Sequence, residues 1–206
     1  VRLIKPLYGI LSLPPYIFNM IYWNFGFLRM SSSGFTSQAL GARNFPEVMN
    51  AFIRSLAIGL GVGVLIIFLQ YPIGLLASGL IKSGAESTGH VMTYFRIVVW
   101  GAPAVLGMYA FKGWFIGMQN AKIPMVIAIL NNLLNVVLSL IFVFGFGMKI
   151  EGIALGTALS QVVSLMVAAG FWWKHYRRLR KYIMRETIWD RHAIREYFRV
   201  NSDIFV

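Results

Sequence analysis

The sequence PMVIAILNNLLNVVLSLIFVFGF at residues 124–146 is long and apolar enough to cross a bilayer as a helix, which takes about 20 residues. No charged residue occurs between Lys122 and Lys149. Asn131, Asn135 and Ser139 recur every fourth residue, so they form one polar line along such a helix. Polar groups at membrane depth face a bundle interior or a wet cavity. The sequence therefore predicts a membrane helix with one functional or packing face.

The whole chain has the composition of a membrane protein that crosses the bilayer several times. It has 206 residues, of which 58% are hydrophobic and 13% charged, and its mean hydropathy is +0.68. These values lie far from those of soluble domains. We predict an all-α polytopic bundle with about five membrane helices, at residues 15–42, 55–81, 91–111, 124–146 and 152–173.

Glycine and proline divide and shape these spans. Gly41 to Asn44 interrupts the first helix, and Pro46 with Glu47 is typical of the first turn of the next one. Gly59 and Gly63 form a G-x-x-x-G pair inside an apolar stretch, which favours close helix packing over a nucleotide-binding loop. Pro103, in the middle of the third span, predicts a kink.

The first span carries a second polar face. Tyr22, Gly26, Arg29, Ser33 and Ser37 share one side of a helix at spacings of three and four residues. We interpret this face as buried in protein or water. The alternative is that the helix ends near Leu28, with Arg29 at the membrane surface.

The fifth span carries a third polar face, formed by Thr157, Ser160, Gln161 and Ser164. Such groups can simply hydrogen-bond one helix to another, for about 1 kcal/mol each. Three polar faces in one small bundle instead favour a polar cavity. We predict that it is lined by Asn135, Ser139, Thr157, Asn131, Arg29, Ser33 and Gln161.

The formal charge of +12 is concentrated in alternate connections, which indicates membrane topology. The predicted loops at 43–54, 112–122 and 174–199 are basic, so we place them in the cytoplasm. Trp114 and Trp172 with Trp173 are predicted at membrane interfaces, and Arg96 is predicted to extend toward the headgroups. The basic segment after Lys174 predicts a helix on anionic lipid, with Tyr176, Leu179 and Ile183 on its apolar face. We favour this over nucleic-acid binding.

No catalytic constellation is visible, so we do not predict an enzyme. Cysteine is absent, which excludes thiolate chemistry and cysteine-bound metal in this chain. His90, His175 and His192 have no carboxylate at ligand spacing, and we interpret them as solvated. Arg29 is the only ionisable residue predicted in the membrane interior, and no metal site is predicted.

Several runs of sequence resemble a known transporter family. These are QALGARN at residues 38–44, GWFIGMQNAKIP at 113–124, and Leu134-Asn135 followed by IFVFGFGMKIEGIALGTALSQ at 141–161. They are similar to the multidrug and toxic compound extrusion (MATE) transporters, in particular their DinF-like bacterial branch, and the resemblance covers about residues 16–206.

The resemblance implies twelve helices in two lobes, of which this chain would supply helices two to six and the start of helix seven. Residues 1–173 would then be the first lobe without its first helix. Residues 174–200 would be a basic cytoplasmic linker, and 201–206 would begin the second lobe. The protein would lie in the bacterial inner membrane.

The implied function is export of small cationic or amphiphilic compounds by alternating access, coupled to inward H+ or Na+ flow, with no other cofactor. Asn135 and Thr157 match an Asn and a Thr of the family's cation site. Ser139 stands where that site has an Asp, and its helix-one acid would lie upstream of Val1. The implied partners are anionic lipid and the second lobe. Alternatives are a lipid-linked saccharide flippase of the same superfamily, and a scaffold or truncated fragment without transport.

Overall fold

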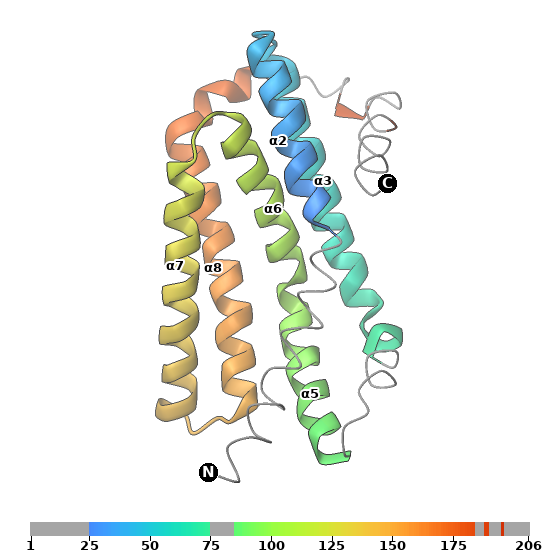
Figure 1. The fold of residues 1–206 in the computed structure, drawn as a ribbon, viewed down its shortest axis with the longest axis vertical. Coiled ribbons are helices and arrows are strands. Elements are labelled where there is room, and N and C mark those ends of the chain that lie inside the picture. The colour runs from blue at the N-terminus through green and yellow to red at the C-terminus, as the bar shows by residue number, and fades with distance from the viewer. Residues whose placement is uncertain (1–24, 75–84, 184–187, 190–194, 196–206) are drawn as a thin grey trace.

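The computed structural model describes residues 25–74, 85–183, 188–189 and 195, and within them it is helical with no strand (Figure 1). This confirms the predicted all-α class. The elements are α2 (Gly26–Gly41), α3 (Phe45–Phe68), α5 (Ala85–Val98), the 3-10 turn η1 (Val99–Gly101), α6 (Ala102–Gly117), α7 (Lys122–Leu140), its π-helical end η2 (Ile141–Gly145), α8 (Ile150–Tyr176) and the 3-10 segment η3 (Arg177–Tyr182).

Four helical stretches in the described part are long and apolar enough to cross a membrane. They are Phe45–Phe68, Met92–Gly117, Lys122–Gly145 and Ile150–Tyr182. The first predicted span is described only from Gly26, because Tyr22 and its neighbours lie outside the described residues. The helix does not end near Leu28 but continues to Gly41, so that alternative is wrong.

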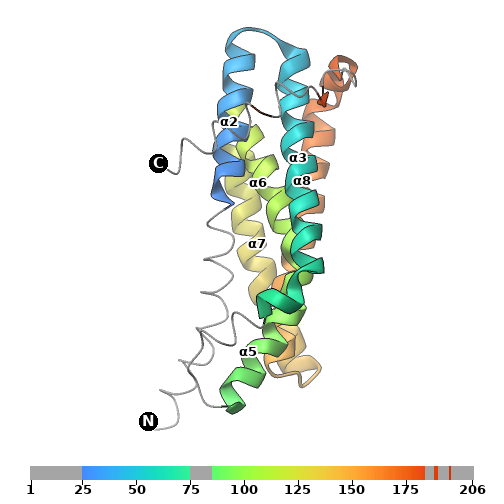
Figure 2. The same ribbon diagram turned by 90° about the vertical axis from the view of Figure 1, so that its right-hand side faces the viewer.

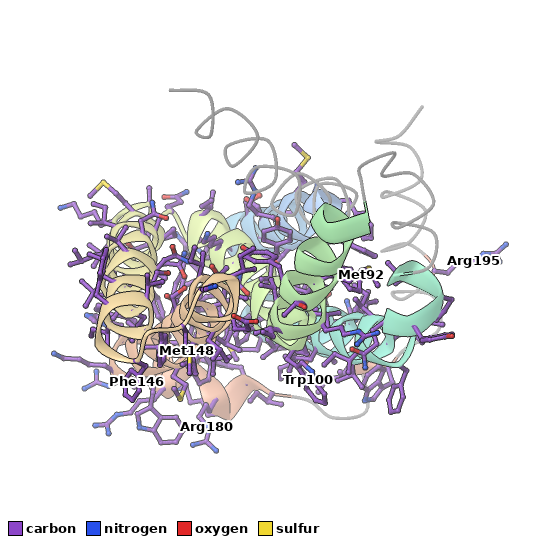
Figure 3. The ribbon with its side chains drawn as sticks, turned by 90° about the horizontal axis from the view of Figure 1, so that it is seen from below. Met92, Trp100, Phe146, Met148, Arg180 and Arg195 are labelled. Carbon is purple, nitrogen blue, oxygen red and sulfur yellow. The ribbon has the colours of Figure 1, made fainter. Side chains whose placement is uncertain are left out.

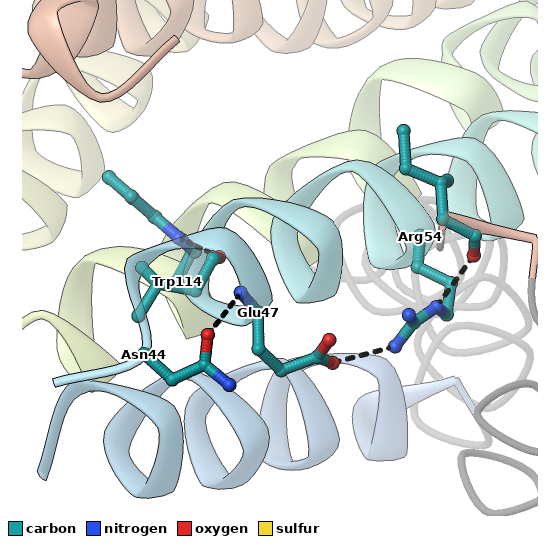
Figure 4. Close-up of polar contacts among 6 residues, drawn as sticks. Asn44, Glu47, Arg54 and Trp114 are labelled. Carbon is teal, nitrogen blue, oxygen red and sulfur yellow. Dashed lines mark hydrogen bonds and ion pairs between the residues drawn. The ribbon is translucent and has the colours of Figure 1, made fainter. Parts of the chain in front are cut away.

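The second span begins ten residues earlier than the charge-free stretch predicted. It starts at Phe45, because Asn44 caps the helix by accepting a hydrogen bond from the Glu47 backbone N–H at 3.3 Å, and Pro46 fits its first turn. Arg54 was assigned to a loop, but it is buried within α3. Its Nη1 bonds Glu47 at 3.0 Å and its Nε donates to the Ile188 carbonyl at 2.9 Å, as Figure 4 shows.

The third span also extends beyond its predicted end. The predicted connection at 112–122 is wrong for its first half, because α6 continues through Lys112 to Gly117. One lysine does not end a helix, since its long apolar stem can lie along neighbouring side chains. Trp114 is fully buried and donates from Nε1 to the Val48 carbonyl at 3.1 Å (Figure 4), so its predicted place at the interface is wrong.

The interruption expected at Pro103 occurs just before it. The helix changes to the 3-10 turn η1 at Val99–Gly101, and α6 begins at Ala102 with Pro103 in its first turn. Proline is tolerated there because the first backbone N–H groups of a helix have no partner within it.

Helix α6 is the centre of the bundle. It lies between α2 and α3 on one side and α7 and α8 on the other (Figure 1), and it packs on α2, α3 and α8. In the turned view, α5 lies at the end of the bundle away from the α2–α3 turn (Figure 2). The helix α7 packs mainly on α8 and forms an outer face of the described bundle.

Close packing at the predicted G-x-x-x-G pair is confirmed. A Cβ added at Gly59 would lie 2.8 Å from the Leu106 carbonyl oxygen, and one at Gly63 would overlap the backbone of Pro103. Gly61, on the opposite side of α3, has no heavy atom within 4 Å of such a Cβ. Backbones therefore touch where α3 crosses α6.

A second glycine pair, Gly113 and Gly117, brings α6 against α2. A Cβ at Gly113 would overlap the Arg29 carbonyl, and one at Gly117 would lie 2.8 Å from the Ser33 carbonyl. Ser32 adds a hydrogen bond to the Ala110 carbonyl at 3.2 Å. The buried face of α2 consists of Leu28, Ser31, Ser32, Thr36 and Ala39.

The predicted polar face of α2 is not the face that packs on α6. Arg29 and Ser37 are exposed in the described bundle, and Ser33 is half-buried. The reason is steric. The backbone of α2 lies so close to Gly113 and Gly117 of α6 that only small side chains, such as Ser32, fit between the two helices.

The basic connections gather at one end of the bundle, which we call the basic end. The α2–α3 turn, the α6–α7 turn and η3 all lie at the top of Figure 1. At the opposite end, Met92 lies on α5 and Met148 follows Phe146 in the α7–α8 turn (Figure 3). The described basic connections therefore lie at one end, as predicted, and the cytoplasmic location of that end stays a prediction of the positive-inside rule.

The first part of the basic segment packs on protein. Tyr176, Leu179 and Ile183 share an apolar face as predicted, but they lie against the aromatic core of the basic end. Trp172 stacks on Phe52 with ring centroids 5.5 Å apart, whereas Trp173 is exposed. The rest of the predicted amphipathic segment falls mostly outside the described residues.

We expect Gly63→Ala to lower the free energy of unfolding by about 1–3 kcal/mol, because the new methyl group must displace the backbone at Pro103. Gly61→Ala is the matched control, two residues away with open space, and should not lower stability. Thermal unfolding of the purified full-length protein in detergent measures both. Equal stability of the two variants would contradict the backbone contact.

Single cysteines introduced at Gln119 in the α6–α7 turn and at Lys149 in the α7–α8 turn should be labelled from opposite sides of the membrane. The chain contains no cysteine of its own to interfere. Labelling with a membrane-impermeant maleimide on intact cells and on inverted vesicles tests this. Labelling of both positions from one side would refute the topology.

Candidate functional site

The polar line of α7 faces α8. In an apolar 18-residue stretch of Lys122–Gly145, only 6% of the residues are buried, against 67% in the corresponding stretch of Met92–Gly117. The helix α7 therefore contacts the bundle along one narrow face. Asn131, Asn135 and Ser139 are half-buried on that face. Gly156 lets the helices meet, since a Cβ there would lie 2.8 Å from the Ser139 backbone nitrogen.

Two hydrogen bonds join the polar face of α7 to that of α8. Asn135 Nδ2 donates to Thr157 Oγ1 at 3.0 Å, and Thr157 Oγ1 donates to the Ile153 carbonyl at 2.9 Å. One turn along, Ser164 Oγ donates to Asn131 Oδ1 at 3.0 Å. The structure thus brings together the two residues, Asn135 and Thr157, that the family resemblance places at a cation site.

Two oxygen atoms at this interface have no hydrogen-bond partner among the described residues. They are Ser139 Oγ and Gln161 Oε1, and both are buried. Gly101 makes room for the Gln161 amide, because a Cβ at that glycine would overlap Oε1. Buried polar atoms are usually paired, so unpaired ones mark positions where a water, an ion or a ligand group fits.

A cavity of about 130 Å³ lies beside this interface, between α6, α7 and α8. Four polar side chains and four apolar ones line it, namely Lys112, Asn131, Gln161, Ser164, Val105, Met108, Tyr109 and Ile127. At roughly 30 Å³ for each water, its size corresponds to about four water molecules.

The two predicted site residues on α2 do not line this cavity. The Ser33 backbone carbonyl contacts Gly117. Arg29 is exposed but lies near enough to Tyr109 and Lys112 for an electrostatic interaction with each. The structure therefore collects Asn131, Asn135, Ser139, Thr157 and Gln161 at one interface, with Arg29 beside its cavity.

Three residues near the site were missed in the sequence. Tyr94 lies within hydrogen-bonding reach of Thr157, and Tyr109 and Lys112 line the cavity. The sequence does not distinguish a tyrosine that lines a polar site from one that only packs in the core, because aromatic residues are common in apolar spans. Lys112 was detectable, because a kinked span beginning at Val91 needs more than 20 residues to cross and so extends past Phe111.

The site is built to bind rather than to react. It contains amides, hydroxyls and one ammonium group, but no nucleophile paired with a base. Among the described residues, no three His, Asp or Glu side chains gather as metal ligands. Such a set can hold polar groups of a small molecule, and its neutral oxygens can contribute ligands to a hard cation.

Comparison with known proteins identifies similar chains. The MatE family model matches residues 11–141. The DNA damage-inducible protein F of Escherichia coli is 35% identical over 142 residues, which are 68% of this chain and 31% of that protein. The multidrug export protein MepA of Staphylococcus saprophyticus is 29% identical over 132 residues, 63% of this chain and 29% of MepA. The chain thus spans about 30% of the length of these relatives.

Solved structures share the fold. The outward-facing conformation of a multidrug resistance MATE family transporter of the MOP superfamily matches with a TM-score of 0.80 and 26% identity. The match covers 94% of this chain and 43% of that one. The described helices therefore have the arrangement found in somewhat less than half of such a transporter.

Thr157→Val should destabilise the protein by about 1 kcal/mol more than Thr93→Val. Both hydroxyls donate to a carbonyl four residues earlier in the helix, Thr157 to Ile153 and Thr93 to Gly89. Only Thr157 also accepts a hydrogen bond from Asn135. Thermal unfolding of the two variants measures the hydrogen bonding of Thr157 to other helices, to Asn135 and to Tyr94 within its reach, and equal losses would show that it contributes nothing.

Proposed function

The chain belongs to the MatE family, and we propose that it forms most of one lobe of a multidrug efflux transporter. The observation that carries the proposal is the polar interface between α7 and α8, set in a bundle that is otherwise apolar. Family relatives and structural neighbours are transporters rather than enzymes. On this proposal, residues 1–173 are lobe, 174–200 are an inter-lobe linker, and 201–206 begin the second lobe.

We propose that transport is an antiport driven by H+ or Na+ and works by alternating access of two lobes. Asn135 and Thr157 are joined by a hydrogen bond, and Ser139 Oγ, four residues after Asn135, has no partner in the described part. These neutral oxygens support a role in holding the coupling ion, which is the only cofactor proposed. Ser33, Asn131, Gln161 and Arg29 are proposed to line the wider path.

The substrates proposed are small cationic or amphiphilic compounds, exported across the inner membrane of a bacterium. Anionic lipid is the proposed partner of the exposed cations at the start of the basic segment, where Arg180 lies 4.7 Å from the Trp173 ring centroid. Arginine beside tryptophan is typical of a membrane surface, where the ring and the cation both meet headgroups. The cations of this surface are Lys174, Arg177, Arg178, Arg180 and Lys181.

In the full-length protein, Asn135→Leu should abolish resistance to a cationic dye while leaving the amount of protein in the membrane unchanged. The substitution removes the amide that bonds Thr157 but keeps a side chain of similar size. Asn132→Leu is the matched control, because Asn132 is exposed on the neighbouring face of α7. Growth inhibition and dye efflux from loaded cells provide the measurements.

Unchanged efflux in Asn135→Leu would refute the proposed role of this interface in transport. Loss of the protein from the membrane in that variant, with normal efflux per molecule, would favour a packing role instead.

A further inference from the structure

One positive charge, that of Lys112, lines the cavity between α6, α7 and α8, and a second, that of Arg29, lies on the exposed side of α2. Lys112 lines the cavity together with Asn131 and Gln161. Arg29 on α2 interacts electrostatically with Lys112. The helices hold the two residues near each other, because the backbone of α2 at Arg29 touches α6 at Gly113, the residue after Lys112.

The position of Lys112 is not that of a lysine extending to the membrane surface. Such a lysine lies along an exposed side of its helix and points its ammonium group toward water. Lys112 is half-buried and lines the cavity five residues before α6 ends at Gly117, about 7.5 Å along the axis at 1.5 Å per residue. Its side chain is therefore part of the cavity wall.

No carboxylate of the described residues neutralises this pair. The acidic side chains that the structure describes are those of Glu47 and Glu151. Glu47 pairs with Arg54 at 3.0 Å, and Glu151 lies in the first turn of α8, at the opposite end from the basic end. Within this part of the chain, the cavity has positive charge without a matching negative one.

The neutral groups of the cavity add hydrogen-bond donors. Asn131 uses Oδ1 to accept from Ser164, so its amide NH₂ group is the end left for a ligand. Gln161 places its Oε1 against Gly101, and its amide NH₂ group is a further potential donor. An ammonium group with amide donors is the set that binds a carboxylate or phosphate oxygen. The volume of about 130 Å³ suits one such group rather than a whole drug.

We propose that this cavity receives the anionic head group, a carboxylate or phosphate, of an amphiphilic substrate. Lys112 is the ion partner of the head group, and Arg29 attracts it from the exposed side of α2. This rests on the proposed transport function and adds amphiphiles that carry a negative group, zwitterions included, to its substrates.

A set of three fluorescent probes tests this with the full-length protein in liposomes of phosphatidylcholine alone. The probes share one alkyl chain and fluorophore and end in a carboxylate, its methyl ester or a quaternary ammonium. Lys112→Gln should lower the rate of carboxylate export about tenfold or more, the factor typical of a lost charge-assisted hydrogen bond, and should change ester export less than twofold. Arg29→Gln should have a smaller effect that disappears at high salt.

Two further variants serve as controls. Lys112→Arg keeps the charge and should retain most carboxylate export, which separates charge from folding. Lys122→Gln removes an exposed charge at the start of α7, away from the cavity, and should match the wild type for every probe. Equal loss of all three probes in Lys112→Gln, or an unchanged ratio of carboxylate to ester, would overturn the proposal.

Binding separates this proposal from the proposed function. In detergent, the carboxylate probe should raise the unfolding temperature of the wild type but not of Lys112→Gln, and the ester should raise neither. If the wild type transports none of the probes but shows this pattern, the export function fails while the anion site stands. Stabilisation by added anionic phospholipid but not by the carboxylate probe would assign the cavity to a lipid headgroup and overturn the substrate proposal.

Discussion

Direct contact between helix backbones at glycine is the constraint on which the rest of this bundle depends. Lipid is as apolar as leucine, so helices in a membrane gain little from apolar burial and associate through close packing and hydrogen bonds. Gly63 touches Pro103, Gly113 touches Arg29, and Gly156 touches Ser139. Each contact joins a different pair of helices, and together they hold α2 and α3 on one side of α6 and bring α7 against α8.

The polar site follows from the same contacts. Because Gly156 allows α7 to approach α8, Asn135 reaches Thr157 at 3.0 Å with short side chains on both helices. Gly101 in the turn η1 leaves the space that the Gln161 amide occupies. The Ser139 and Gln161 oxygens at the same interface are left without a partner in the described part of the chain and so can accept one.

The sequence predicted the polar faces of α7 and α8 but not every residue of the cavity. A period of four residues reveals Asn131, Asn135 and Ser139, because amides and hydroxyls are rare in apolar spans. The same kind of spacing did not identify the packing face of α2, which carries Ser31, Ser32 and Thr36 rather than Arg29. Lys112 is predicted in a loop, because a charged residue is expected to end an apolar span.

Hydropathy, charge and helical spacing alone specify an all-α membrane bundle, its turns at Gly41 to Asn44 and around Asn120, the sorting of basic connections to one end, and the pairing face of α7. These are properties of single helices and of the chain's order, which local residues determine. Only the tertiary structure decides that Lys112 faces a cavity, that Trp114 is buried, and which serines of α2 touch α6. Those outcomes depend on how close two backbones approach, and that distance depends on glycines far apart in the sequence.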